Sequence, residues 1–173
     1  MSSSSLILID SETASSSASI SLTGISATYD VYMLQIINSS SASDNVDFRI
    51  RVTKASDSSV DTTTNYDASA KEILTSGAGN ITGLSQSYYK LDIRSGTGTQ
   101  EVMNGISYLF NFFSASDYSF ITMENSFRSA VPTAGQTMGG GVHKVAQSCN
   151  GVNISYSSGN IASGEFKLYG LKK

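Results

Sequence analysis

The chain has 173 residues, of which 39% are hydrophobic and only 14% are charged, and its formal net charge is −3. This length can bury the core of one domain, and the small net charge with apolar residues in alternating runs excludes disorder throughout. One cysteine, Cys149, excludes an intrachain disulfide and a cysteine-built zinc site. The eleven Lys and Arg residues are scattered, which argues against a nucleic-acid partner.

The chain shows no sign of a membrane segment or an export signal. No apolar run approaches the length of a membrane span. The first ten residues, MSSSSLILID, lack the basic residues of a secretory signal, and their apolar core is too short. We therefore expect residues 1–5 to form a flexible lead-in to a protein made without a signal peptide.

The composition favours strands over helices. Serine supplies about a fifth of the residues, and fifteen glycines accompany a single proline. Ser, Thr and Gly are weak in helix interiors. Candidate strands, in chain order, are Leu6–Ile9, Ala18–Leu22, Tyr29–Ile37, Val46–Thr53, Gly79–Leu84, Ser87–Ile93, Glu101–Phe113, Tyr118–Phe127, Thr137–Ala146, Val152–Tyr156 and Glu165–Tyr169.

Several of these segments indicate which side chains face the core. Val46–Thr53 alternates cleanly, with Val46, Phe48, Ile50 and Val52 on the core face and Arg49 among the solvent residues. Tyr29–Ile37 is apolar on both faces, which predicts cover from the opposite sheet and from a loop or a neighbouring subunit. In Glu101–Phe113 we expect four residues to supply much of the aromatic core: Ile106, Tyr108, Phe110 and Phe112.

Three segments stand apart from the simple strand pattern. Tyr66–Thr75 is the one plausible helical turn, because Ala70, Ile73 and Leu74 are spaced for a helix face. Gly139–Gly141 weakens a strand and predicts a bulge or a close backbone approach. Ser95–Thr99 reads as a tight hairpin loop. Together the segments predict a single antiparallel β-sandwich of jelly-roll type, with about eight or nine strands and at most one short helix.

The C-terminal stretch Gly151–Leu171 reads as two half-buried strands that close the sandwich as its last hairpin. Its part SSGNIASGEFKLYGL resembles the C-terminal signature of β-sandwich virion proteins from tailed, especially marine, bacteriophages. The stretch TYDVYMLQIINSSSASDNVDFRIRV, within Ala27–Thr53, resembles the early strand pair of the same family. The resemblance implies a structural role in a virus particle.

Little in the sequence indicates catalysis or a metal. His143 is the only histidine, and we interpret it as structural and Cys149 as a buried thiol. Asp57–Asp61 with Asp67 is the best acidic group for calcium, but it lacks the glycine-punctuated loop of an EF-hand. We expect no catalytic residues, no metal and no cofactor.

The tyrosines leave two interpretations open. Exposed aromatic rings bind the flat faces of sugars, and they also suit protein interfaces because the ring is apolar and the hydroxyl can stay wet. We favour the interface. The candidate interface or glycan-contact residues are Tyr88, Tyr89, Tyr118, Tyr169 and Leu171.

These observations predict a non-enzymatic structural protein of a tailed-phage virion. We expect a capsid decoration or head-associated protein that packs against copies of itself, with a trimer as the favoured symmetry, and against other capsid or tail proteins. Its place would be the virion, with no nucleic-acid or membrane partner. The alternative is a tail-fibre or spike subunit, or a β-sandwich module that binds a receptor or a host surface glycan.

Overall fold

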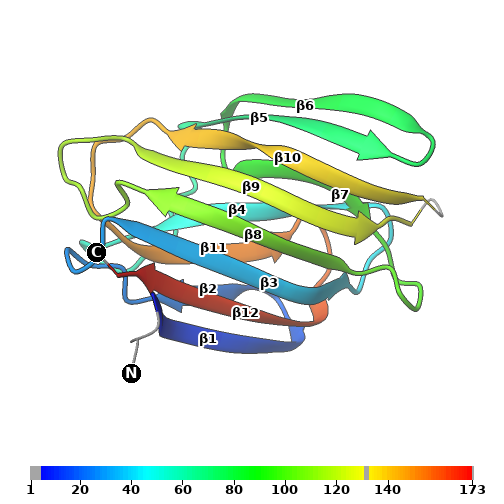
Figure 1. Cartoon of the computed structure of the whole chain (residues 1–173), viewed down its shortest axis with the longest axis horizontal. Helices are drawn as coiled ribbons and strands as arrows, with labels where there is room; N and C mark the ends of the chain where they lie inside the picture. Colours follow the sequence, from blue (N-terminus) through cyan, green and yellow to red (C-terminus); the bar gives the residue numbers. More distant parts are fainter. Residues whose placement is uncertain (1–4, 131–132, 173) are drawn as a thin grey trace.

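The computed structural model describes residues 5–130 and 133–172, which form twelve β-strands and no α-helix (Figure 1). Residues 1–4 of the predicted lead-in lie outside these ranges. The strands are β1 (Leu6–Ser17), β2 (Ile20–Thr23), β3 (Val31–Ser41), β4 (Val46–Lys54), β5 (Tyr66–Leu74), β6 (Gly77–Gln86), β7 (Tyr89–Ser95), β8 (Met103–Phe110), β9 (Ser119–Arg128), β10 (Ala134–His143), β11 (Cys149–Tyr156) and β12 (Ile161–Leu171).

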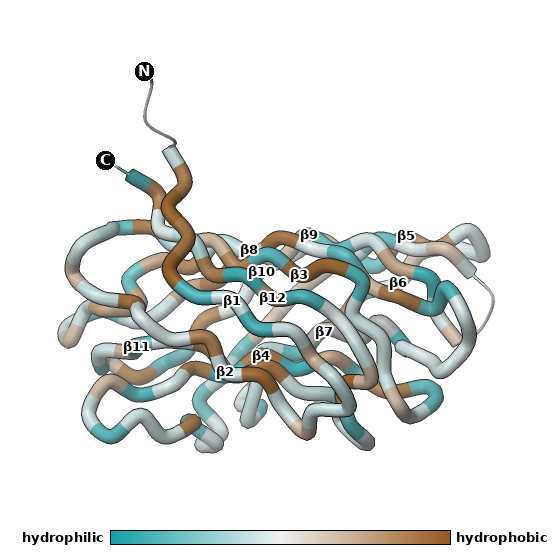
Figure 2. The backbone as a smooth tube through the Cα atoms, turned by 90° about the horizontal axis from the view of Figure 1, so that it is seen from below, coloured by the Kyte–Doolittle hydropathy of each residue, from teal (hydrophilic) through white to brown (hydrophobic). Residues whose placement is uncertain are grey.

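The strands form two antiparallel sheets that pack face to face (Figures 1 and 2). The wide sheet has eight strands in the order β1-β12-β3-β8-β9-β10-β5-β6, and the narrow sheet has four in the order β2-β11-β4-β7. Eight of the strands are divided equally between the sheets: β1, β3, β8 and β12 lie in the wide sheet, and β2, β4, β7 and β11 lie in the narrow one. Along the chain, each step from one of these strands to the next crosses between the sheets, except the step from β4 to β7. This is the jelly-roll arrangement, so the predicted fold class is confirmed.

The strand count exceeds the predicted eight or nine because two hairpins are inserted into the jelly roll. The hairpin β5–β6 lies between β4 and β7 in the chain, and β9–β10 lies between β8 and β11. Both extend the wide sheet at the same edge, beyond β8, through the pairings of β9 with β8 and of β10 with β5. The result is a wide sheet with twice as many strands as the narrow one.

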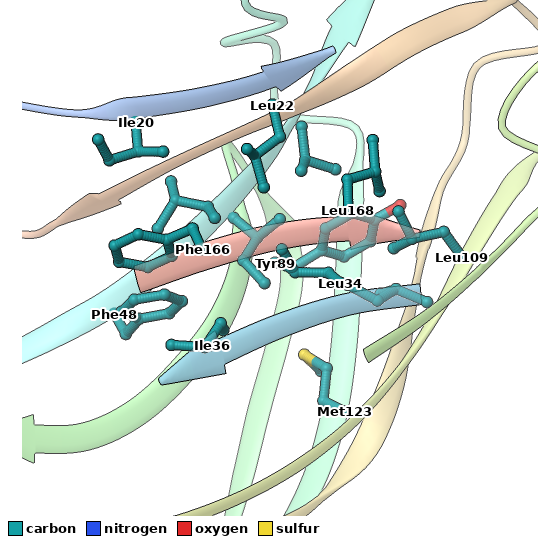
Figure 3. Close-up of a cluster of buried hydrophobic side chains, with 14 of the residues drawn as sticks. Ile20, Leu22, Leu34, Ile36, Phe48, Tyr89, Leu109, Met123, Phe166 and Leu168 are labelled. Atoms are coloured by element: carbon teal, nitrogen blue, oxygen red, sulfur yellow. The ribbon is translucent and has the colours of Figure 1, made fainter. Parts of the chain in front are cut away.

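The core lies between the two sheets and is filled by the inward side chains of both. Figure 3 shows Leu34, Phe166 and Leu168 of the wide sheet pointing toward Leu22 and Phe48 of the narrow one. Val46, Phe48, Ile50 and Val52 of β4 are buried in alternation, as predicted. Thr53, on the side predicted to face solvent, is also buried.

The segment Tyr66–Thr75 is a strand, so the prediction of a helical turn was wrong. Tyr66, Ala68, Ala70 and Glu72 are buried in alternation, which is the period of a strand. β5 pairs with β10 on one side and with β6 on the other. Its apolar residues fit either period, and pairing on both sides of the strand decides in favour of the sheet.

Two predicted hairpins do not form, because consecutive jelly-roll strands cross from one sheet to the other. β11 pairs with β2 and β4 in the narrow sheet, whereas β12 pairs with β1 and β3 in the wide sheet. The stretch Ser95–Thr99 likewise connects β7 of the narrow sheet to β8 of the wide one. It is a connection between sheets.

The face of β8 that was predicted to be core points outward. Met103, Ser107 and Leu109 are the buried residues of this strand, whereas Ile106 and Tyr108 are each 39% exposed. Phe110 shares the outward face. Of the four residues predicted to supply the aromatic core, Phe112, which follows the strand, is the one that is buried in it.

We predict that Phe48→Ala lowers the free energy of unfolding by about 3–5 kcal/mol, because it leaves a cavity in the core. Phe48 is fully buried, with its ring centroid 5.4 Å from that of Tyr156. The matched control is Arg49→Ala on the same strand, which removes a stacking contact with Tyr88 and should cost about 1 kcal/mol or less. Urea denaturation measures both; an equal or larger loss for Arg49→Ala would contradict the assignment of the core face.

Candidate interaction surface

The face of the wide sheet that points away from the narrow sheet, here called the outer face, is the candidate site. Figure 2 shows the two layers edge on, and none of the segments in the described ranges forms a third layer over this face. Leu6–Ile9 and Tyr66–Leu74 belong to strands of this sheet and do not fold over it. The outer face is therefore open to a partner.

Register places large apolar side chains in adjacent rows across the outer face. In one row, Leu8 pairs with Tyr169, Tyr169 with Met33, and Met33 with Tyr108. In the next, Phe110 pairs with Val31 and with Phe120, which pairs with Val142. We call the following set the apolar band: Leu6, Leu8, Val31, Met33, Leu84, Tyr108, Phe110, Phe120, Val142, Tyr169 and Leu171.

The band explains the apolar outward side of β3. Met33 is only 7% exposed although no layer covers it, because Tyr169 and Tyr108 flank it in the same row. Both sides of Tyr29–Ile37 were predicted to be covered. The core covers one side, and side chains of the neighbouring strands cover most of the other. Other side chains of the band remain exposed: Leu8 is 52% exposed and Phe120 is 45% exposed.

The band occupies one end of the strands, and the other end of the outer face is more polar. The next row of outward residues lies two residues further along each strand from the row of Met33. It holds Lys167, Gln35, Ile106, Glu124, Met138 and Lys71. Lys167 is paired with Glu165 at 2.9 Å. The outer face therefore has direction, apolar where β1 begins and β12 ends, and charged toward the opposite ends of these strands.

A groove of about 620 Å³ hollows the outer face over β10. Its floor includes Gly140, which has no side chain to fill the space between its neighbours. Phe120 and Val142 form part of one wall, and Leu84 of β6 stands across from them. Asp67 also lines the groove, and its carboxylate is occupied by Lys144 Nζ at 2.9 Å. The groove is thus mainly apolar and continues the apolar band.

The first residues of β1 and the last of β12 project from the sandwich on the side of the outer face (Figure 2). We call residues 6–8 with 169–171 the terminal ribbon. Leu6 pairs with Leu171 and Leu8 with Tyr169, and Lys172 N donates a hydrogen bond to Ser5 O. A β-bulge between Leu8 and Asp10 bends β1 at the base of the ribbon. The ribbon carries apolar side chains away from the body of the molecule.

Of the predicted contact residues, Tyr169 and Leu171 lie in the apolar band and are half-buried. Tyr118 is 47% exposed, in the connection between β8 and β9 outside the band. Tyr89 is fully buried, so its prediction as a contact residue was wrong. Its ring packs on the inner side of β10, where a Cβ at Gly141 would lie 2.7 Å from its Cδ1 atom. The predicted close approach at Gly139–Gly141 is therefore a contact between the two sheets.

Tyr88 lies on the opposite side of the molecule, against the outward side of β4. The guanidinium of Arg49 stacks on its ring at 4.3 Å, and that of Arg51 lies at 5.5 Å. Arg51 is further fixed by donating from Nε to Ser87 O. One ring face of Tyr88 is thus covered by arginine, which leaves it a poor platform for a sugar.

Sequence reasoning missed most of the apolar band. The alternation of β9 held a usable signal: Ile121 and Met123 are buried while Phe120 is exposed. Phe120 alternates with these buried residues, so an aromatic side chain on the outward side of the strand is the signal for an apolar surface there. For Leu84 and Leu8 no local pattern gives the answer, because their exposure depends on which strands sit at the sheet edges.

A buried polar cluster closes one end of the sandwich. Asp61 accepts hydrogen bonds from Thr63 N and Oγ1 and from Gln147 Nε2, and its backbone O accepts one from Tyr66 Oη. His143 Nε2 lies 3.3 Å from Asp61 Oδ2. His143 and Cys149 are both fully buried, as expected of a structural histidine and a buried thiol.

The pKa values of the cluster follow from burial. Burial lowers the pKa of His143 below its ordinary value, and the opposing attraction of Asp61 does not make up the difference. Burial also acts to raise the pKa of Asp61, but its hydrogen bonds from Thr63 and Gln147 outweigh it and the pKa is lowered. Burial raises the pKa of Cys149 to about 11. The histidine is therefore neutral and the thiol protonated near neutral pH.

The acidic residues considered for calcium have separate partners. Asp57 accepts hydrogen bonds from Ser59 and pairs with Lys54, whereas Asp67 accepts from Ser85 and pairs with Lys144. Asp61 belongs to the buried cluster. Across residues 5–130 and 133–172, no three His, Cys, Asp or Glu side chains converge as metal ligands.

We predict that the protein loses stability as the pH falls from 7 to 5.5 because of His143, the only histidine. Its folded pKa is lowered, so below about pH 6.5 the unfolded chain binds a proton that the folded protein does not, and stability falls by roughly 1 kcal/mol per pH unit. Thermal unfolding as a function of pH measures this. His143→Gln should flatten the slope in this window, and a stability that rises on acidification would show a protonated His143 paired with Asp61.

The described parts of the chain contain no helix that could cross a membrane. Comparisons with protein-family models, with curated proteins and with solved structures found no match to this chain.

Proposed function

We propose that the chain is a non-enzymatic structural protein of a tailed-phage virion, acting as a capsid decoration or head-associated protein. It packs against copies of itself and against the particle through its outer face. The observation that carries the proposal is the apolar band on a sheet face that no segment in the described ranges covers. The resemblance of SSGNIASGEFKLYGL to virion β-sandwich proteins supports the particle as the setting.

The band is more than the scattered apolar exposure of an ordinary surface. A two-sheet sandwich needs to bury only one side of each sheet, and single exposed apolar residues are normal. Here Leu8, Tyr108 and Phe120 lie in two adjacent rows of one sheet. Contiguous apolar surface of this kind marks a site of protein contact.

The segment that resembles the virion family contributes to both sides of the wide sheet. Phe166 and Leu168 of β12 are buried in the core, and Tyr169 and Leu171 alternate with them to face outward. The final residues of the signature, LYGL, therefore place one leucine in the core and a tyrosine and a leucine in the apolar band. The same residues serve folding and contact.

Decoration of the capsid is favoured over a tail-fibre or spike role by the way the chain is used. The twelve strands account for most of the described residues and lie in one sandwich. Those residues contain no helix from which a coiled-coil stalk could be built. Packing by a broad sheet face suits attachment to a surface, and a closed homo-oligomer such as a trimer would satisfy particle symmetry.

A receptor- or glycan-binding module is the second candidate, and one observation favours it. A depression of about 320 Å³ lies between residues 26–32 and 111–114, lined by Asp30, Asn111 and Phe113. Phe113 is 38% exposed, and Tyr118 lies in the same β8–β9 connection. Polar groups beside an exposed aromatic ring are suited to a sugar.

We predict that Tyr169→Asp weakens self-association or binding to particles that lack the protein by at least about tenfold, because a carboxylate would have to be desolvated within the band. Light scattering and co-sedimentation with particles measure this, and circular dichroism checks that the variant folds. Tyr118→Asp is the matched control and should bind as the unchanged chain does.

The two candidates separate cleanly in the same experiment. A strict monomer at high concentration that also fails to bind particles would contradict the structural role. Binding of that monomer to a glycan array, weakened by Tyr118→Asp and unaffected by Tyr169→Asp, would establish the second candidate.

A further inference from the structure

The groove and the terminal ribbon lie at the same end of the strands but at opposite edges of the wide sheet. The ribbon belongs to β1 and β12 at one edge, and the groove is lined by β10, β5 and β6 at the other. Both are on the side of the outer face: the groove opens there, and the ribbon projects there (Figure 2). Each molecule therefore carries an apolar ribbon and an apolar groove. Because they lie at opposite edges of the sheet, the ribbon cannot reach the groove of its own molecule.

We propose that the groove receives the terminal ribbon of a second copy, in a face-to-face dimer whose two-fold axis runs along the strands. The inference rests on the outer face being the docking surface of the proposed function, and it names the occupant. Each copy gives its ribbon and receives the other's, so the contact is closed and self-complementary, as a two-fold interface requires.

Symmetry selects this axis. A two-fold axis along the strands keeps each strand end over the same end of the partner and exchanges the two edges of the sheet. It therefore lays the apolar band on the other copy's band and β1 over the other copy's β6. A two-fold axis across the strands would instead lay the band on the polar rows that hold Lys167, Glu124 and Lys71, which would lose their water without gaining partners.

The chemistry of the two parts agrees. The ribbon offers Leu6, Leu8 and Leu171, and the groove offers the walls formed by Phe120, Val142 and Leu84. Leu84 is 75% exposed, the highest exposure among the large apolar residues of the described chain. The one carboxylate in the groove, Asp67, already has its ion pair with Lys144. No charge on either side has to be buried alone.

The area is sufficient for a stable dimer. Eight strands about 4.8 Å apart, with four outward residues per strand about 6.8 Å apart, give a face on the order of 1,000 Å². A standard stable interface buries about 800 Å² per partner. The outer face is therefore large enough for one partner, and a two-fold dimer seated on the apolar band, with the polar rows outside the contact, replaces the trimer as the smallest closed assembly.

Cysteine cross-linking tests the arrangement directly. Leu8→Cys and Leu84→Cys chains are mixed and mildly oxidised; we expect a disulfide between the two variants and little within either variant alone. The native Cys149 is fully buried and gives no background. Ser21→Cys, exposed on the narrow sheet, is the control and should not join either partner. Preferential joining of Leu8→Cys to itself would overturn the proposed axis.

Analytical ultracentrifugation supplies the second measurement. Leu8→Asp and Phe120→Asp should each weaken the dimer by at least about 100-fold, because they place a carboxylate in the apolar contact. Ile73→Asp is the matched control: Ile73 is 50% exposed on the same face but lies outside the band, and its change should stay within about threefold. Equal loss in all three variants would overturn the inference.

The outcome is separable from that of the proposed function. A strict monomer that still binds particles through Tyr169 would overturn the ribbon-in-groove dimer and leave the structural role standing. A monomer that binds no particle would overturn both.

Discussion

The architecture depends on how closely the narrow sheet can approach the extended part of the wide one. Four strands have to close the core of an eight-stranded sheet, and β7 is the one that faces β10, β5 and β6. The inner sides of these three strands carry small residues, among them Gly139, Gly141, Ala68 and Ala70, in place of the branched side chains that hold packed sheets about 10 Å apart. The large ring of Tyr89 fills the space that they leave, and Tyr89 Oη donates to Ser119 O.

That close approach also shapes the outer face. A run of three glycines that admits Tyr89 on the inner side necessarily leaves Gly140 without a side chain on the outer side, since neighbouring residues of a strand point to opposite faces. The groove on the outer side of β10 and the close contact with Tyr89 on its inner side therefore have the same cause, the run of three glycines. If a larger residue replaced Gly140 and filled the groove, the backbone of β10 could shift little to accommodate it, because Gly139 and Gly141 are held in place by the packing of the sheets.

The sequence predicted the fold where alternation is strict and failed where it depends on partners in the sheet. Val46–Thr53 alternates between apolar and polar residues, so its four core residues were predicted correctly, although Thr53 at its end is also buried. Tyr66–Thr75 has small and apolar residues that fit two periods, and the pairing with β10 and β6 that decides between them is invisible locally. The same holds for β8, where aromatic residues on the outer face outnumber those inside, and large side chains were taken as a sign of burial.

For the candidate surface, the sequence located part of the contact and not its extent. Tyr169 and Leu171 follow from the alternation of the last strand, whereas Leu8, Leu84 and Phe120 join them only through strand order across the wide sheet. Strand order is set by which chain segments cross between sheets, and hydrophobic pattern carries little information about such crossings.

The two outward sides of the sandwich have opposite character, and this gives the molecule an orientation. The outward side of the narrow sheet carries Arg49, Arg51 and Ser155, with Tyr88 stacked on the arginines, while the outer face of the wide sheet carries the apolar band. A protein that used both sides equally would have no reason to separate them. Contact through the wide sheet leaves the polar side in water, where guanidinium and hydroxyl groups need no new partners. In an assembly built this way, the side that meets solvent is the narrow sheet, and the side that is buried is the one that the inserted hairpins have doubled in width.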